Sequence, residues 1–170
     1  MNPATRKVVW ALSTLGIAAC VLLCGLSFDL DLVDKLFPWI LLLLGPLFVL
    51  SLLAALHHKA STGRWWWRWN EQTQGKPAWV VFWFYLLMAN VAGHFIWTMY
   101  EHGPGVPAIV DGDYVLDSRG HILKELTPEE YFRLRSLDLR LFATIYLYLY
   151  FVHAVYWLYP DDNSQKGPDA

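Results

Sequence analysis

Long apolar stretches and short polar links alternate along the whole chain. Four of the stretches each approach the roughly 20 residues that a helix needs to cross the hydrocarbon core of a bilayer. Their apolar positions run together and do not alternate with the period of two that a membrane β-strand requires. The pattern therefore predicts an all-α fold, a bundle of four transmembrane helices. The predicted spans are Val8–Phe28, Phe37–Leu56, Trp79–Tyr100 and Leu139–Tyr159.

Proline and glycine mark two features of these spans. Gly45 and Pro46 lie in the middle of the second span, and a kink is expected there because proline has no backbone N–H. Lys76 and Pro77 precede the third span and are typical of a helix start. The chain accordingly divides into helices one to three with their links (1–100), which include a basic, tryptophan-rich link (57–78), then a long loop (101–138), the fourth helix (139–159) and a tail (160–170).

The loop 101–138 carries its own structural signals. Gly103–Pro107 is rich in glycine and proline and predicts a rigid segment without helix potential. Asp113–Leu116 and His121–Leu123 are interpreted as the strands of a small β-hairpin, with Gly120 at the turn position that needs a positive φ. Because an isolated hairpin is marginal in water, it should rest on a helix, on the membrane surface or on a partner.

A helix start follows the hairpin. Thr127, Pro128 and Glu130 match an N-cap, a proline in the first turn and a capping box. No helix breaker follows, so this helix is expected to continue into the fourth span and to stand a turn or more clear of the bilayer. The predicted architecture is thus a transmembrane bundle with a small extracytoplasmic insertion, a β-hairpin plus the start of a helix.

Composition agrees with a membrane location. The 170 residues are 56% hydrophobic and 16% charged, whereas about a quarter of an average soluble domain is charged. The net charge of −2 selects no polyanion, and no glycine-rich phosphate loop is present, so neither nucleic acid nor nucleotide is an expected partner. Cys20 and Cys24 lie within the first span, so no disulfide framework is expected. Ile17–Cys20 resembles a lipidation motif, but its apolar continuation favours a retained signal anchor.

Lysine and arginine counts in the links predict the orientation. Arg6 and Lys7 precede the first span, whereas the long loop 101–138 holds eight acids against four bases. The link between the second and third spans carries Lys59, Arg64, Arg68 and Lys76. Both termini are therefore expected in the cytoplasm, in a multi-pass protein of a bacterial-type inner (plasma) membrane.

Polar residues recur at helical spacing on the last two spans, on a face with Asn90, His94, Thr98 and Glu101 and on a face with Tyr146, Tyr150, His153 and Trp157. A chemical interpretation is a polar seam between these helices that holds haem b or a quinone through His94 and His153. The favoured alternative is interhelical hydrogen bonding. The two histidines differ in predicted depth by roughly 12 Å, a poor match to two axial ligands of one haem. Glu101 and Arg140 are expected to form a structural ion pair near the outer boundary.

Two other groups of residues suggest binding. The first has side chains suited to zinc or a hard cation but matches no compact metal motif, so a solvated acidic loop is favoured and no metal site is predicted. Its members are Glu101, His102, Asp111, Asp113 and His121. The second is expected to anchor the chain at the bilayer interface. A more specific hypothesis is that it binds a particular lipid or a partner by cation–π contacts. It comprises Arg64, Trp65, Trp66, Trp67, Arg68 and Trp69.

These observations favour a non-catalytic role. The sequence shows no nucleophile–base pair, no complete metal set and no membrane-centred acid of the kind that proton-coupled transporters use. The expected function is that of an accessory or scaffold subunit which contacts the lipid bilayer or a larger membrane complex. The alternative is a membrane redox protein that binds haem b or quinone through histidines of the third and fourth helices.

Overall fold

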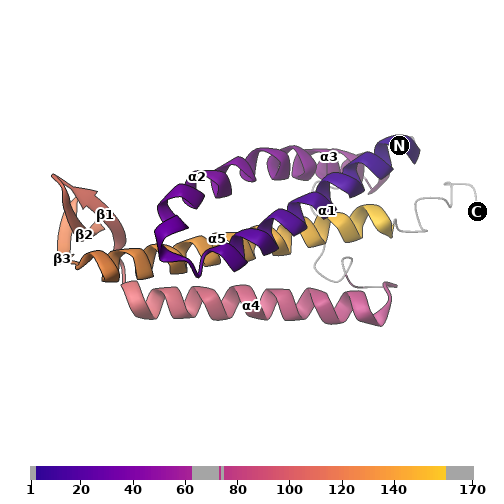
Figure 1. The fold of residues 1–170 in the computed structure, drawn as a ribbon. Coiled ribbons are helices and arrows are strands. Elements are labelled where there is room, and N and C mark those ends of the chain that lie inside the picture. The colour runs from indigo at the N-terminus through magenta and orange to yellow at the C-terminus, as the bar shows by residue number, and fades with distance from the viewer. Residues whose placement is uncertain (1–2, 63–72, 74, 160–170) are drawn as a thin grey trace, which may run out of the picture.

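The computed structural model describes residues 3–62, 73 and 75–159. This part of the chain is mostly helical and carries a three-stranded antiparallel sheet at one end of the helices, here called the sheet end (Figure 1). Four helical segments are long and apolar enough to cross a membrane, the number expected from the sequence, which suggests a multi-pass membrane protein. They cover Ala4–Leu26, Leu30–His57, Ala78–His102 and Pro128–Leu158.

The last helix, α5 (Pro128–Leu158), is the centre of the bundle. α1 (Pro3–Leu26) lies against it, and α4 (Ala78–His102) runs along another side of it (Figure 1). In the apolar window of α5, 56% of the residues are buried, compared with 11% in α4. α5 therefore supplies most of the core, whereas α4 is attached at the edge and leaves most of its surface outward.

The main core lies between α5 and the first two spans. Small and aliphatic residues of α1 and α3 (Leu44–Thr62) meet the tyrosine-rich face of α5 there. Tyr150, with 1% of its surface exposed, fills the space above Gly16, where any added Cβ would overlap the tyrosine ring. The buried residues of this cluster are Val9, Cys20, Leu23, Ile40, Leu47, Leu50, Ala54, Leu139, Ala143, Tyr146, Tyr150 and Trp157.

The second span is interrupted as the glycine–proline pair predicted. α2 (Val33–Leu42) ends before Leu43, and α3 begins at Leu44, two residues before Pro46. Pro46 has no N–H to donate to the turn before it. The Leu43 carbonyl, at the break, accepts a long bond of 3.4 Å from the Leu47 N–H and a shorter one of 2.7 Å from the Tyr150 hydroxyl of α5.

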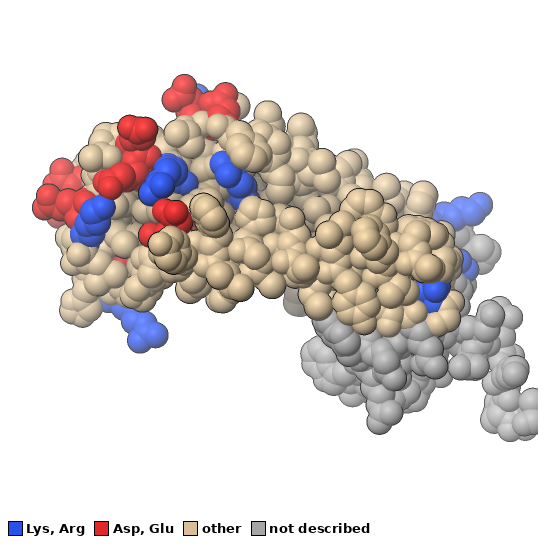
Figure 2. All heavy atoms as spheres, turned by 90° about the horizontal axis from the view of Figure 1, so that it is seen from below, with Lys and Arg blue, Asp and Glu red and all other residues tan. Residues whose placement is uncertain are grey.

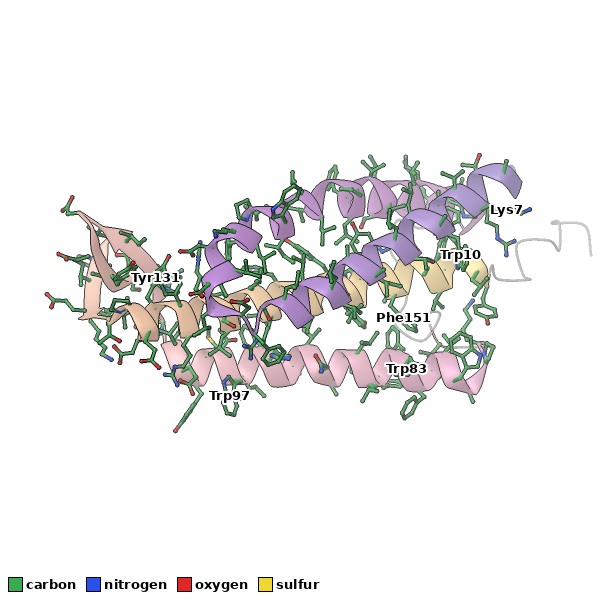
Figure 3. All side chains as sticks on the ribbon, viewed as in Figure 1. Lys7, Trp10, Trp83, Trp97, Tyr131 and Phe151 are labelled. Atoms are coloured by element: carbon green, nitrogen blue, oxygen red, sulfur yellow. The ribbon has the colours of Figure 1, made fainter. Side chains whose placement is uncertain are left out.

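Charged residues gather at the two ends of the molecule. Figure 2 shows acids and bases over the sheet end, a middle zone with no visible charge, and a few bases at the opposite end. Lys7 and Trp10 lie at the end opposite to Tyr131, which is beside the sheet (Figure 3). A zone free of charge between charged ends is the distribution that a membrane-spanning bundle requires.

Two arginines tie α1 and α5 together at their ends. Arg6 of α1 donates to the carbonyls of Trp157 and Leu158 in the last turn of α5, at 2.6 and 2.8 Å. At the sheet end, Arg140 of α5 donates to Ser27, which directly follows α1. Carboxyl ends of helices carry unpaired carbonyls and a partial negative charge, so a cation at each one stabilises the antiparallel pair.

The sheet module consists of β1 (Val106–Val110), β2 (Asp113–Ser118), β3 (His121–Glu125) and the first turns of α5. The hairpin β2–β3 was expected; its turn has Arg119 at φ 56° and Gly120 at φ 85°, so the expected positive φ of Gly120 is confirmed. β1 was not expected, because the glycines and prolines of 103–107 indicate an irregular segment and hide the strand that begins within it. Leu116 of β2 packs against Leu134 and Leu137 of α5. The hairpin prediction is thereby corrected to a three-stranded sheet that rests on a helix.

α5 begins as the sequence predicted. The Thr127 hydroxyl accepts from the Glu130 N–H at 3.2 Å, and the Glu130 carboxylate accepts from the Thr127 N–H at 2.9 Å, which completes the capping box. The helix then runs for 31 residues, about 46 Å at 1.5 Å per residue. A hydrocarbon core is about 30 Å thick, so α5 is longer than a single crossing requires.

Replacing Thr127 by alanine is expected to lower the stability of the first turn of α5 by about 1 kcal/mol, because the Glu130 N–H loses the hydroxyl that accepts from it. Hydrogen exchange of the amides of residues 129–131 measures the effect. Thr14→Ala is the matched control, since the Thr14 hydroxyl donates to the Trp10 carbonyl within one helix and caps nothing. Equal exchange rates in wild type and Thr127→Ala would contradict this prediction.

Candidate functional site

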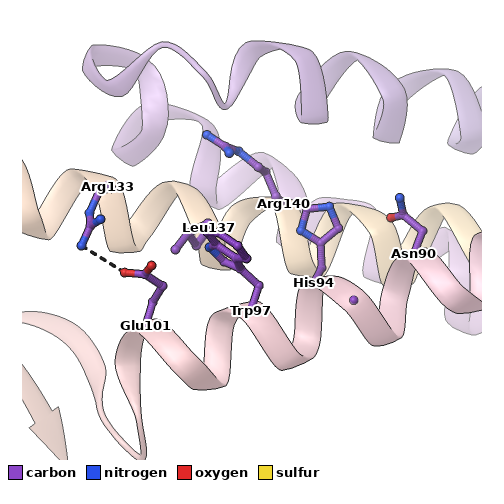
Figure 4. Close-up of a pocket in the computed structure, with 8 residues that line it drawn as sticks. Asn90, His94, Trp97, Glu101, Arg133, Leu137 and Arg140 are labelled. Carbon is purple, nitrogen blue, oxygen red and sulfur yellow. Dashed lines mark ion pairs between the residues drawn. The ribbon is translucent and has the colours of Figure 1, made fainter.

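A groove between α4 and α5 is the candidate site. It has a volume of about 510 Å³ and lies in the half of the bundle that carries the sheet (Figure 4). α4 contributes one stripe of residues three, four and seven positions apart, and α5 contributes residues three and four apart, as expected for two helix faces. The lining residues are Asn90, Gly93, His94, Trp97, Glu101, Arg133, Leu137 and Arg140.

Glu101 closes the sheet end of the groove. Its carboxylate pairs with Arg133 at 3.1 Å, and the arginine side chain is 59% exposed (Figure 4). The expected ion pair between Glu101 and Arg140 is therefore wrong. Arg133 lies two helical turns nearer to the sheet than Arg140, at the height of the last turn of α4, and so it reaches Glu101 first.

Arg140 instead belongs to a network of hydroxyl groups. Its Nε donates to the Ser27 hydroxyl at 3.1 Å, and an Nη donates to the Ser136 hydroxyl at 2.7 Å. The guanidinium lies 4.0 Å from the centre of the Phe28 ring and points away from α4 (Figure 4). Within the part of the chain that the structure describes, no carboxylate forms an ion pair with it. Its positive charge is held by dipoles and a ring but is not neutralised.

The structure does not bring His94 and His153 together. His94 lies on α4 and lines the groove beside Asn90, with both side chains directed toward α5 in Figure 4. His153 is buried, and its Nδ1 bonds the Leu149 carbonyl of its own helix at 2.6 Å. His153 follows the groove residue Arg140 by 13 positions, roughly 20 Å along a helix. The alternative of a haem or quinone site stays a prediction, and at this separation one site would use one of the two histidines without the other.

The expected seam between the third and fourth spans also needs correction. The face of α5 with Tyr146, Tyr150 and Trp157 lies in the core formed with α1 and α3. Within the described residues, no member of α4 belongs to this core cluster. α4 meets a different face of α5, where Phe84 contacts the ring of Tyr148 with ring centres 5.5 Å apart. The tyrosine face was assigned to the wrong neighbour because helical spacing shows which residues share a face but not what covers it.

The residues considered for a metal do not converge. His102 is 5% exposed, and its Nδ1 lies 3.7 Å from the carboxylate of Asp138 on α5, a buried contact that the sequence did not indicate. Asp111, Asp113 and His121 are exposed on the strands and turns of the sheet. Among residues 3–62, 73 and 75–159, no group of three or more histidine, cysteine or acidic side chains is placed to hold a metal ion.

The tryptophan-rich segment, Arg64, Trp65, Trp66, Trp67, Arg68 and Trp69, lies outside the described residues. Its assignment to lipid or partner contact stays a prediction. Cys20 and Cys24 are both free thiols, and Cys20 is fully buried in the core formed by α1, α3 and α5.

The sheet has an unusual free edge that the sequence did not reveal. All five residues of β3 are exposed, including Ile122 at 56% and Leu123 at 49%. In the strand order β1-β2-β3, one side of β3 pairs with β2 and no described strand covers the other side. A water-facing edge strand with exposed apolar side chains is a template for pairing with another chain.

No family model, no curated protein and no solved structure matches this chain. Its function is therefore argued from the residues and their geometry alone.

Proposed function

We propose that this protein is a non-catalytic accessory subunit of a larger membrane assembly and that the sheet module docks a protein partner. In this proposal the four helices span a bacterial-type inner membrane with both termini in the cytoplasm. The sheet end lies outside, because Arg6, Lys7, Lys59 and Lys76 belong to the opposite end and its adjoining link.

The free edge of β3 is the observation that carries the proposal. A protein strand added to this edge would gain main-chain hydrogen bonds and would cover Ile122 and Leu123. β1, at the other edge of the sheet, is less suited because Pro107 lacks an N–H. We therefore assign the docking surface to β3.

Charge favours a protein over the membrane surface as the occupant. Acids gather over the sheet end in Figure 2. Around the sheet they are Asp111, Asp113, Asp117, Glu125, Glu129 and Glu130, against the bases Arg119 and Lys124, the second of which pairs with Glu130. Anionic headgroups would repel such a surface, whereas a partner strand flanked by lysine or arginine would complement it.

Photocrosslinking tests this proposal. A photoreactive amino acid at position 123, in the full-length protein in its own membranes, is expected to give a single adduct of defined mass. Replacing Ile122 by lysine should reduce this adduct at least tenfold, because a charge in an apolar strand interface is costly to bury. The same photoreactive residue at position 106, on the edge of β1, is the control, because Val106 is at least as exposed as Leu123, 56% against 49%. It should give no such adduct.

The opposite outcomes are equally clear. Adducts to lipid alone at position 123 would place the sheet on the bilayer and overturn the proposal. An adduct that survives Ile122→Lys would show that β3 is not the docking edge. Equal adducts from positions 106 and 123 would show unspecific contact at the sheet.

A further inference from the structure

The groove between α4 and α5 has an extent that fits an amphiphile. On α4 its lining runs from Asn90 to Glu101, eleven residues or roughly 16 Å along the axis. Its upper part lies at the height of Ser27, where α1 ends, because Arg140 bonds that residue. Helix ends and charged residues mark the boundary of the hydrocarbon core. The groove therefore begins at the membrane boundary and continues into the apolar zone.

The charged residues of the groove leave one positive charge without a partner. Arg133 and Arg140 contribute two positive charges and Glu101 one negative charge, a net charge of +1. Arg133 is paired with Glu101 at 3.1 Å, whereas no described carboxylate pairs with Arg140. A charge near the hydrocarbon zone is costly unless an opposite charge lies close to it. An anion bound in the groove would balance this charge.

The remaining walls suit a hydrocarbon chain. Trp97 is 56% exposed at the boundary depth where tryptophan is enriched, and Leu137 forms the wall on α5. Gly93 keeps the floor open, because an added Cβ there would meet no atom within 4 Å. Asn90 and His94 add hydrogen-bonding groups at the deep end.

We propose that this groove binds the phosphate group of an anionic glycerophospholipid, with Arg133 facing the phosphate, the positive charge of Arg140 in the adjoining wall attracting it, and an acyl chain lying along Gly93 and Trp97. Arginine is suited to phosphate because its planar guanidinium donates in pairs. The site is separate from β3 and goes beyond the proposed docking function.

Native mass spectrometry of the full-length protein, exchanged into detergent with one defined lipid, tests the proposal. The wild type is expected to retain one phosphatidylglycerol and to retain phosphatidylcholine roughly tenfold less. Gly93→Leu should reduce the phosphatidylglycerol adduct roughly tenfold, because the added side chain begins in open space and occupies the groove. Gly25→Leu is the matched control, since Gly25 also has free space around it but does not line the groove.

Two charge variants test the role of Arg133. Arg133→Gln should weaken retention, and Glu101→Gln should strengthen it, because it releases Arg133 from its ion pair. Arg119→Gln removes a positive charge at the hairpin turn, outside the groove, and should change nothing. A purely structural ion pair predicts no gain from Glu101→Gln.

The outcomes separate the sources of the phosphate. If inorganic phosphate displaces the lipid at equal concentration, the site binds free phosphate, and the proposal that it binds a phospholipid is overturned. If Gly93→Leu retains phosphatidylglycerol like the wild type, or phosphatidylcholine is retained equally, the groove is not an anion site. Each of these results leaves the β3 crosslinks unaffected, so the two proposals fail independently.

Discussion

Replacing Gly16 by leucine is expected to lower the free energy of unfolding by about 3 kcal/mol or more, the largest effect of any single change considered. A Cβ at this position would overlap the ring of Tyr150, and a leucine side chain needs still more room. The ring cannot move freely, because its hydroxyl donates to the Leu43 carbonyl at 2.7 Å. The overlap therefore separates α1 from α5 or breaks this bond to the interrupted second span.

Thermal unfolding in one defined detergent measures this effect as a fall in Tm. Gly25→Leu, in the same helix, is the control and should leave Tm within a degree or two, since nothing lies within 4 Å of its Cβ. The double variant Gly16→Leu with Tyr150→Ala should recover part of the loss, because the smaller residue gives the leucine space. An unchanged Tm in Gly16→Leu would show that the close approach of the two helices is not needed.

Helix positions could be predicted from the sequence because each depends on local residues. The capping box at Thr127 and the proline at Pro46 act on the backbone within one turn, and the structure confirms both. The apolar stretches likewise mark the four candidate spans without any knowledge of their neighbours. The strand Val106–Val110 was missed because its pairing with β2 is a tertiary contact that overrides the turn signal of Gly105 and Pro107.

The candidate site was only partly predictable. Helical spacing placed Asn90, His94 and Glu101 on one face of α4, and all three line the groove. The spacing could not show that α5 turns its tyrosines toward α1 and α3, since this depends on how helices pack. Nor could it show that Arg133 reaches Glu101 before Arg140 does, because both arginines lie on the same face of α5.

Replacing Ser136 by alanine is expected to cost about 2 kcal/mol and to lower the ratio of folded to unfolded protein roughly thirtyfold. Ser136 is 1% exposed, donates to the Ser27 carbonyl at 2.5 Å and accepts from Arg140 at 2.7 Å. Alanine removes both bonds and leaves a buried carbonyl and a guanidinium with fewer partners. Because the groups form one network, the loss should exceed that of a single hydrogen bond.

Ser13→Ala is the matched control for this change. Ser13 is equally buried, at 0% exposure, but its hydroxyl donates at 3.0 Å to the Val9 carbonyl, within its own helix. A backbone N–H can satisfy that carbonyl without the hydroxyl, so the change should cost under about 0.5 kcal/mol. Denaturant titration of both variants compares a bond between helices with one inside a helix. Equal losses would show that the network of Ser27, Ser136 and Arg140 does not hold α1 to α5.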